Sequence, residues 1–352
     1  MHDVLCSWFS FYDDNEWSQN IVMSAMKTLP SLRSLTIDAK YLKIPLNLDE
    51  FTSLHTISLL NSNDSDHSEE IMDTLAKMVA NSPQLTSIEL LPQSHQEVTS
   101  PKHSLHHLVK YMPNDAAVLR LRHLGLSESL LRLDSTTLPH FRSLKSLQLT
   151  GITDPYSPFY NNPSNLDEVR QVGSSLEDFW RTMANEGIWL EEIDHVDVCP
   201  EFQDYLMMYS GLRSLKLTPD PWSKEPAYVK AQAERFFAIP GPLLQHSQTL
   251  EELFIRPRYE GGWCFDVQSP SESLSACVHL KKLGVGIISE QLRMPYRPPG
   301  RPKQELPPLF RFYQLNETAV PEENAIVSHF FLSNENLINY QLNLVSNASS
   351  IP

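Results

Sequence analysis

One short pattern of apolar and polar positions recurs along the chain. It reads apolar, two polar, apolar, one of any kind, apolar, and we number its residues as positions 1 to 6, with position 7 next. The first copy has Leu32, Leu35 and Ile37 at positions 1, 4 and 6. Further copies begin at Leu54, Leu85, Leu121, Leu144, Ile193, Leu212, Leu250 and Leu280, and a weaker one begins at Leu337. Because side chains alternate across a strand, positions 4 and 6 share one face and positions 3, 5 and 7 the other.

Segments with helical spacing separate many of the copies. An apolar stripe of helical period predicts helices at Glu69–Val79 (with Ser68 as N-cap), Ser104–Met112, Leu166–Met183, Phe202–Met208, Tyr228–Phe237 and Glu322–Leu332. A strand this short cannot bury its apolar face alone, whereas strands stacked side by side share one continuous core. The alternation therefore predicts an α/β chain built on a parallel sheet.

The copies resemble leucine-rich repeats, and their irregular form resembles the repeat half of fungal F-box/leucine-rich-repeat proteins. The resemblance covers Leu32 to Leu342. It implies a solenoid with a curved parallel β-sheet on the concave side and helices and irregular loops on the convex side. We expect an N-terminal capping helix region without a complete F-box at 1–28, the solenoid at 29–345, and a flexible tail at 346–352. Insertions are expected near 151–187 and 290–320.

Composition and charge narrow the range of partners. The 352 residues include 28 Lys and Arg against 43 Asp and Glu, a formal net charge of −15. Such a chain is a poor general ligand for nucleic acid or for an anionic membrane surface. No segment approaches the ~18 apolar residues of a membrane-spanning helix, and four cysteines fit no paired metal site or disulfide framework. We expect a protein of the cytoplasm or nucleus.

Residues that could carry catalytic or metal chemistry have simpler explanations. His103 and His107 would lie one turn apart on a helix, but a solvated or partly packed histidine face is favoured over a metal site. Cys199 shares a strand face with His195 in this register, yet a half-buried cysteine is favoured over a nucleophile. We therefore expect no catalytic residue, no metal and no cofactor.

The open face of the sheet is the expected binding surface. Its extended mixture of small, polar and charged side chains suits a protein ligand better than a small molecule, which needs an apolar pocket. The candidate partner-binding residues are Glu89, His123, Gln148, His195, Asp197, Lys216, Phe254, Arg256 and Lys282. These features predict a non-enzymatic protein-interaction scaffold.

By resemblance, the scaffold would be the substrate-recognition part of an F-box-type ubiquitin-ligase receptor lacking its F-box. A ligase adaptor would be a further partner only if an F-box preceded the chain. The alternatives are a leucine-rich-repeat regulator of a small GTPase and a truncated paralogue without a ligase role.

Overall fold

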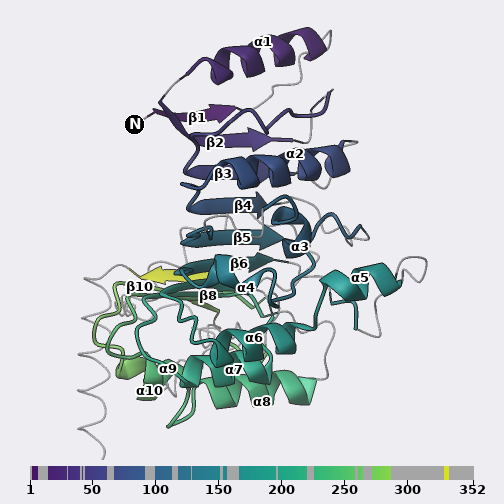
Figure 1. Cartoon of the computed structure of the whole chain (residues 1–352). Coiled ribbons are helices and arrows are strands. Elements are labelled where there is room, and N and C mark those ends of the chain that lie inside the picture. The colour runs from purple at the N-terminus through teal and green to yellow at the C-terminus, as the bar shows by residue number, and fades with distance from the viewer. Residues whose placement is uncertain are drawn as a thin grey trace, which may run out of the picture. The chain divides into compact units, whose positions relative to one another are not determined.

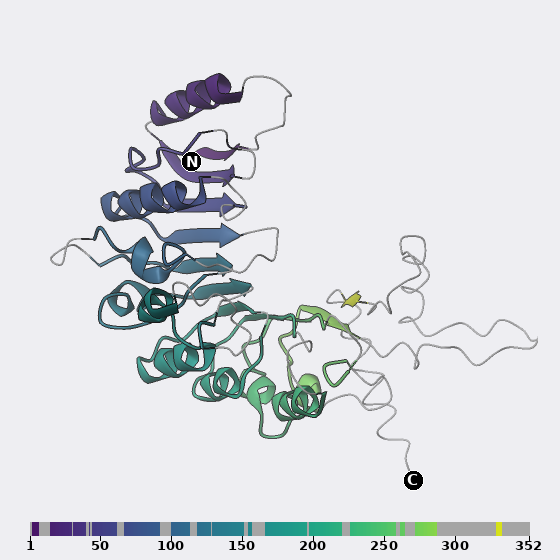
Figure 2. The same cartoon turned by 90° about the vertical axis from the view of Figure 1, so that its right-hand side faces the viewer.

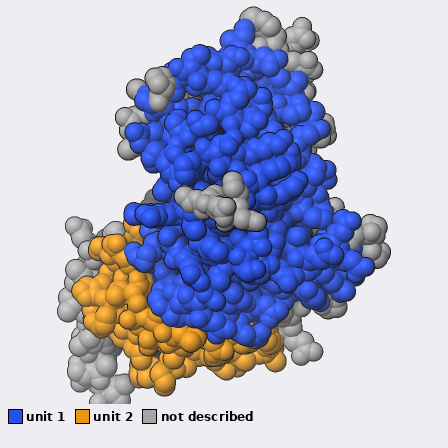
Figure 3. Space-filling view, viewed as in Figure 1, with its two compact units in different colours: residues 1–194 blue, residues 195–352 orange. Residues whose placement is uncertain are grey.

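The computed structural model divides the chain into two compact units, residues 1–194 (unit 1) and residues 195–352 (unit 2), coloured separately in Figure 3. The structure describes residues 2–6, 15–29, 31–39, 42, 44–61, 67–91, 100–112, 118–127, 129–150, 154–156, 166–195, 197–219, 226–257, 261–264, 272–286 and 329–332.

The described strands β1 to β6 of unit 1 are parallel, and each pairs with the next in chain order (Figure 1). They are β1 His2–Cys6, β2 Leu32–Asp38, β3 Thr56–Leu60, β4 Ser87–Leu91, β5 His123–Ser127 and β6 Ser146–Thr150. In β2 to β6 the strand register aligns position 4 of each copy in one row and position 6 in a second row. The rows are Leu35, Ile57, Ile88, Leu124, Leu147 and Ile37, Leu59, Leu90, Leu126, Leu149, none more than 5% exposed. The predicted apolar face is confirmed for these strands.

Helices cover that apolar face. Unit 1 contains α1 Asn15–Lys27, α2 Ser68–Asn81, α3 Leu105–Leu108, α4 Leu138–Phe141, α5 Leu166–Val172 and α6 Leu176–Asn185. The longest, α2, buries the predicted stripe of Ile71, Leu75, Met78 and Val79. Figure 2 shows α2 and α3 on one side of the sheet and α1 beyond β1 at its end, and no described helix of unit 1 lies on the other side of β2 to β6. One sheet face in this unit therefore has no described helix over it, and we call it the open face.

A repeated backbone contact fixes how each strand enters the sheet. The carbonyl oxygen of His55 accepts hydrogen bonds from the N–H groups of Thr86 and Ser87, at 2.9 and 3.1 Å. The carbonyl oxygens of Thr86, Arg122, Lys145, Arg213 and Glu251 each accept the same pair from the next copy. All of these carbonyls belong to position 2. Since the contact recurs, every strand that makes it starts at the same position of the pattern.

Unit 2 repeats the arrangement with fewer strands. Its strands β8 Ser214–Leu217, β9 Glu252–Ile255 and β10 Lys282–Gly286 pair in parallel, and β11 His329–Leu332 pairs antiparallel with β10. Its helices are α7 Pro200–Met207, α8 Pro226–Phe236, α9 Pro242–Gln245 and α10 Glu272–Ser275. Positions 4 and 6 again form two buried rows, Leu215, Leu253, Leu283 and Leu217, Ile255, Val285. Strand β7, Glu192–His195, carries the chain from unit 1 into unit 2.

Two elements differ from the helix predictions. The single helix expected at Leu166–Met183 is interrupted at Ser174. The backbone N–H and the hydroxyl of Ser174 both donate hydrogen bonds to the carbonyl oxygen of Leu131, each at 2.7 Å. Ser175 then caps α6 by accepting a hydrogen bond from the N–H of Asp178. The helix expected at Glu322–Leu332 is wrong for His329–Leu332, which form β11.

The two ends of the chain add further differences. Region 1–28 contains the expected helix α1, but it also contains β1, which extends the parallel sheet beyond β2. At the start of α2 the N-cap is His67, one residue before the expected Ser68. The insertion near 290–320, the copy beginning at Leu337 and the tail at 346–352 lie outside the described residues. Among the helices that are described, none has the length and apolar character to cross a bilayer.

Candidate functional site: the open sheet faces

The open face of unit 1 consists of polar rows from positions 3 and 5 of β2 to β6. Position 3 supplies Ser34, Thr56, Ser87, His123 and Ser146, and position 5 supplies Thr36, Ser58, Glu89, Gly125 and Gln148. Most of these residues are half-buried, in contrast to the fully buried rows on the other face. The register thus brings the predicted site residues Glu89, His123 and Gln148 onto three adjacent strands.

Glu89 and His123 form the charged centre of this face. The His123 Nε2 atom lies 3.0 Å from Glu89 Oε1, and His123 Nδ1 lies 2.9 Å from Ser146 Oγ. The contact with His123, reinforced by Ser58, holds the pKa of Glu89 below its usual value. Gly125 provides the room for this arrangement, because a Cβ atom there would lie 3.1 Å from Glu89 Cγ. Glu89 is therefore ionised at neutral pH and held in a defined position.

Ser146, His123 and Glu89 have the order of hydroxyl, imidazole and carboxylate found in nucleophilic triads. Such a triad also needs N–H groups aimed at the developing oxyanion. The N–H groups of β5 belong to a strand that is paired on both sides, with β4 and with β6, so its ladder already uses them. Sequence reasoning missed Ser146 as the third member. We interpret the three side chains as a polar network that orders the face.

The structure places His195 and Asp197 differently from the sequence prediction. The N–H groups of Glu191 and Glu192 bond the Lys145 carbonyl, which makes them positions 2 and 3 of their copy. The copy therefore begins at Leu190, three residues before the predicted start, and His195 falls at position 6. His195 is 1% exposed and packs its ring at 5.2 Å from the ring of Phe202. Asp197 follows β7 and belongs to no strand.

The open face of unit 2, by which we mean the sheet face of positions 3, 5 and 7, carries the other four predicted residues. Lys216, Phe254 and Gly284 share the position 5 row, and Lys282 lies beside Glu252 in the position 3 row. Lys282 and Arg256 are exposed, Lys216 is half-buried, and Lys282 forms an ion pair with Glu252. The guanidinium of Arg256 lies 5.1 Å from the centroid of the Phe254 ring, a cation–π distance.

Phe254 lies flat against the strand next to it. A Cβ atom at Gly284 would lie 2.5 Å from Phe254 Cδ1 and 3.1 Å from Cε1, so the ring occupies the space that a side chain would need. As a result Phe254 is only 8% exposed although it belongs to the open face. It serves as a platform for Arg256 and offers little apolar surface of its own.

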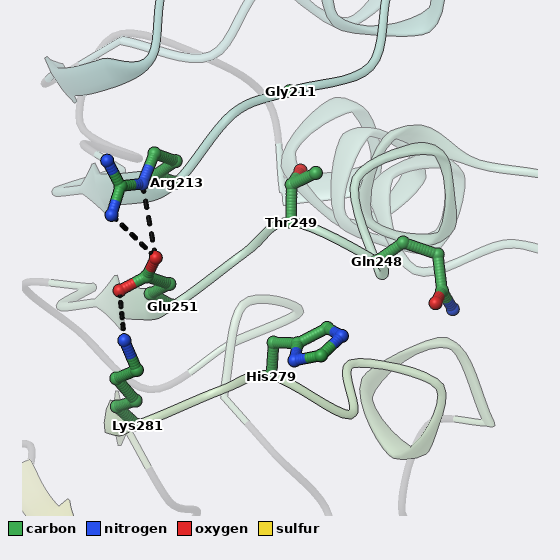
Figure 4. A pocket seen from close by; sticks show the side chains of 7 residues that line it. All are labelled: Gly211, Arg213, Gln248, Thr249, Glu251, His279 and Lys281. Atoms are coloured by element: carbon green, nitrogen blue, oxygen red, sulfur yellow. Dashed lines mark hydrogen bonds and ion pairs between the residues drawn. The ribbon is translucent and has the colours of Figure 1, made fainter.

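A pocket of about 330 Å³ opens at the start of the same three strands (Figure 4). Its lining consists of Gly211, Arg213, Gln248, Thr249, Glu251, His279 and Lys281. Glu251 stands between two cations: Arg213 Nη2 lies 2.7 Å from Oε1, and Lys281 Nζ lies 2.5 Å from Oε2. These contacts lower the pKa of Glu251 to about 2. None of these residues was predicted, although Arg213, Glu251 and Lys281 all occupy position 2.

The histidine cluster is split among different partners. His103 Nε2 lies 2.8 Å from Ser68 Oγ, whereas His106 Nε2 lies 2.8 Å from Asp134 Oδ2. His107 is buried, with Nε2 3.8 Å from Asp73 Oδ1. Within the described residues, no three His, Cys, Asp or Glu side chains are grouped to hold a metal ion. These side chains join α2 and α3 to their surroundings.

We expect the free energy of unfolding to fall as the pH drops from about 6.5 to about 4. Burial lowers the pKa of His103 and of His246 to about 4. The unfolded chain binds these protons at a pKa near 6.5, so it takes up protons before the folded chain does. The free energy of unfolding therefore has its full value above pH 6.5 and falls toward pH 4, by up to about 3 kcal/mol for each histidine.

Urea unfolding of wild type and His103→Gln across this pH range tests the expectation. In the variant, the free energy of unfolding should change less with pH than in the wild type. Glu69, Lys102 and His107 surround His103, and Glu69 opposes the shift while the other two reinforce it. An unchanged pH dependence in the variant would exclude His103 as a source.

Comparisons with protein-family models, with curated proteins and with solved structures returned no match.

Proposed function

We propose that the chain is a non-enzymatic scaffold of the leucine-rich-repeat type, acting in the cytoplasm or nucleus, which binds another protein on the open face of its sheet. The observation that carries this proposal is the separation of roles between sheet faces. Positions 4 and 6 are aliphatic in β2 to β6 and pack under the helices, while positions 3 and 5 form ordered polar rows with no described helix above them.

An open, polar and pre-ordered face favours a protein ligand. Glu89, His123 and Ser146 are held by one another, so little side-chain entropy remains to be lost on binding. The pocket described above lies in unit 2, at the strand starts and not on these rows. The narrower form of the proposal, substrate recognition for a ubiquitin ligase, is supported by the sequence resemblance alone.

Site-specific photo-crosslinking tests the proposal in cells that express the chain. A benzophenone amino acid replaces Ser87, which lies on the open face beside His123, or Asn81, which is exposed at the end of α2 on the helical side. We expect the Ser87 probe to capture one recurrent protein whose yield falls when wild-type chain is added in excess. The charge reversal Glu89→Arg should lower that yield about tenfold, as expected for a central contact.

The Asn81 probe is the matched control because it samples the other side of the same unit. Equal capture of the same protein from Asn81, or capture at Ser87 that an excess of wild type does not reduce, would contradict binding at the open face.

A further inference from the structure

We propose that unit 2 binds an acidic segment of a protein partner, an extended stretch rich in Asp and Glu, on a surface that spans the starts and the open face of β8 to β10. The inference deepens the proposed function, on which it rests, by giving the chemistry of the partner. We call this surface the basic surface of unit 2; it comprises Arg213, Lys216, Arg256, Lys281 and Lys282.

The distribution of charge in the two units supports the assignment. The copies that form β8 to β10 contain five basic residues and two acidic ones, Glu251 and Glu252. The chain as a whole, by contrast, has a formal net charge of −15. In unit 1, positions 3, 5 and 7 of β2 to β6 include no Lys or Arg, and every one of those residues is described. At the same positions 3, 5 and 7, unit 2 has Lys216, Arg256 and Lys282 against Glu252 alone. Position 2 includes basic residues in both units, so the cationic excess that sets unit 2 apart lies at positions 3, 5 and 7.

Four of the five cations of this surface are held by described contacts. Glu251 fixes Arg213 and Lys281 from both of its oxygens, and Glu252 pairs with Lys282. Arg256 stacks on the Phe254 ring, which Gly284 allows to lie against β10. Ordering these long side chains before binding lowers the entropy cost of the complex. The two carboxylates thus organise the surface, and within these three copies the basic residues outnumber the acidic ones by five to two.

Geometry matches an extended peptide. Adjacent strands lie about 4.8 Å apart, so β8 and β10 are separated by about 10 Å. In an extended chain, carboxylates two or three residues apart are separated by about 7 to 10 Å. Lys216 at position 5 of β8 and Arg256 at position 7 of the next copy are offset by one strand and two residues, about 8 Å between backbone positions. A segment that crosses the strands can therefore place two successive carboxylates over this pair, and a carboxylate further along the segment over Lys282.

The surrounding charge argues against a polyanion such as nucleic acid. Glu251 and Glu252 lie within the surface itself, and the net negative charge of the chain repels a dense array of phosphates at long range. A short segment with a few carboxylates avoids most of that repulsion.

Fluorescence anisotropy with labelled peptides tests the assignment on the full chain. The probes are peptides of about 12 residues in which Ser alternates with Glu, Gln or Lys, and a single-stranded oligonucleotide of equal length. We expect binding of the Glu peptide alone, weakened strongly between about 50 and 300 mM salt. Replacing Lys216, Arg256 and Lys282 by Gln should raise its Kd about tenfold.

A charge-matched variant provides the control. Lys110→Gln, Lys145→Gln and Lys230→Gln remove three exposed basic residues elsewhere and should leave the Kd within about twofold of wild type. Equal weakening in both triple variants, absence of Glu-peptide binding, or tighter binding of the oligonucleotide would overturn the assignment. Since the Ser87 crosslinking experiment samples unit 1, it can succeed when this one fails, which distinguishes the two proposals.

Discussion

Replacing Leu147 by alanine is expected to lower the free energy of unfolding of unit 1 by about 2–5 kcal/mol. Leu147 is 1% exposed and sits in the position 4 row, opposite Leu124 on the neighbouring strand. Truncation removes apolar contacts and leaves a cavity that the rigid parallel sheet cannot close. Chemical denaturation followed by circular dichroism measures the change.

The adjacent residue provides the control. Gln148 lies on the opposite, open face, so Gln148→Ala should change the free energy of unfolding by no more than about 0.5 kcal/mol. Similar losses in the two variants would show that both faces of β6 are packed, and the open face would have to be abandoned.

Introducing a methyl group at Gly284 is expected to destabilise unit 2 by about 1–3 kcal/mol, the usual cost of overpacking. The new Cβ atom would lie 2.5 Å from Phe254 Cδ1, so the ring or the strand has to move. Thermal and urea unfolding of Gly284→Ala measure the cost. Gly261→Ala is the control, since nothing lies within 4 Å of a Cβ atom there.

A second substitution tests whether the Phe254 ring is the obstacle. In a Phe254→Ala background, Gly284→Ala should cost little, which gives a coupling energy of about 1–3 kcal/mol in a double-mutant cycle. Additive effects of the two substitutions would mean that the destabilisation has another origin than the ring.

The buried rows could be predicted from the sequence because their chemistry is repetitive. Positions 4 and 6 are aliphatic in β2 to β6 and in β8 to β10, and period-2 alternation then assigns their faces without knowledge of the register between strands. The same alternation correctly placed Glu89, His123 and Gln148 on the open face.

The prediction failed where one copy breaks the repetitive chemistry. Leu190 and Ile193 fill positions 1 and 4 of the β7 copy, but position 6 is His195. The sequence also offers Ile193, Val196 and Val198 as an all-aliphatic copy, so the wrong register was the more regular one. The predicted register is shifted by three residues, and an odd shift places every side chain on the opposite face of the sheet. The prediction therefore put His195 on the binding surface, whereas the structure has it in the core. The aromatic ring of Phe202 explains why a histidine is accommodated there.

Contacts between distant residues were beyond the reach of the sequence pattern. Strand β11 pairs antiparallel with β10. The sequence of its four residues does not indicate which strand of the sheet it pairs with. The row at position 2 was overlooked because its side chains vary, whereas its constant feature is a backbone carbonyl that accepts two hydrogen bonds. Arg213, Glu251 and Lys281 therefore looked unrelated in sequence, although that carbonyl contact aligns them across three strands.

Cysteine labelling along β6 tests the two-faced sheet most directly. Single cysteines replace Ser146, Leu147, Gln148 and Leu149 in turn, in a chain whose Cys6 and Cys264 are serine; Cys199 and Cys277 are buried and can remain. We predict fast maleimide labelling at 146 and 148, and labelling at 147 and 149 slower by about a hundredfold until denaturant is added. Uniform rates along the strand, or fast labelling at 147 and 149, would contradict the account.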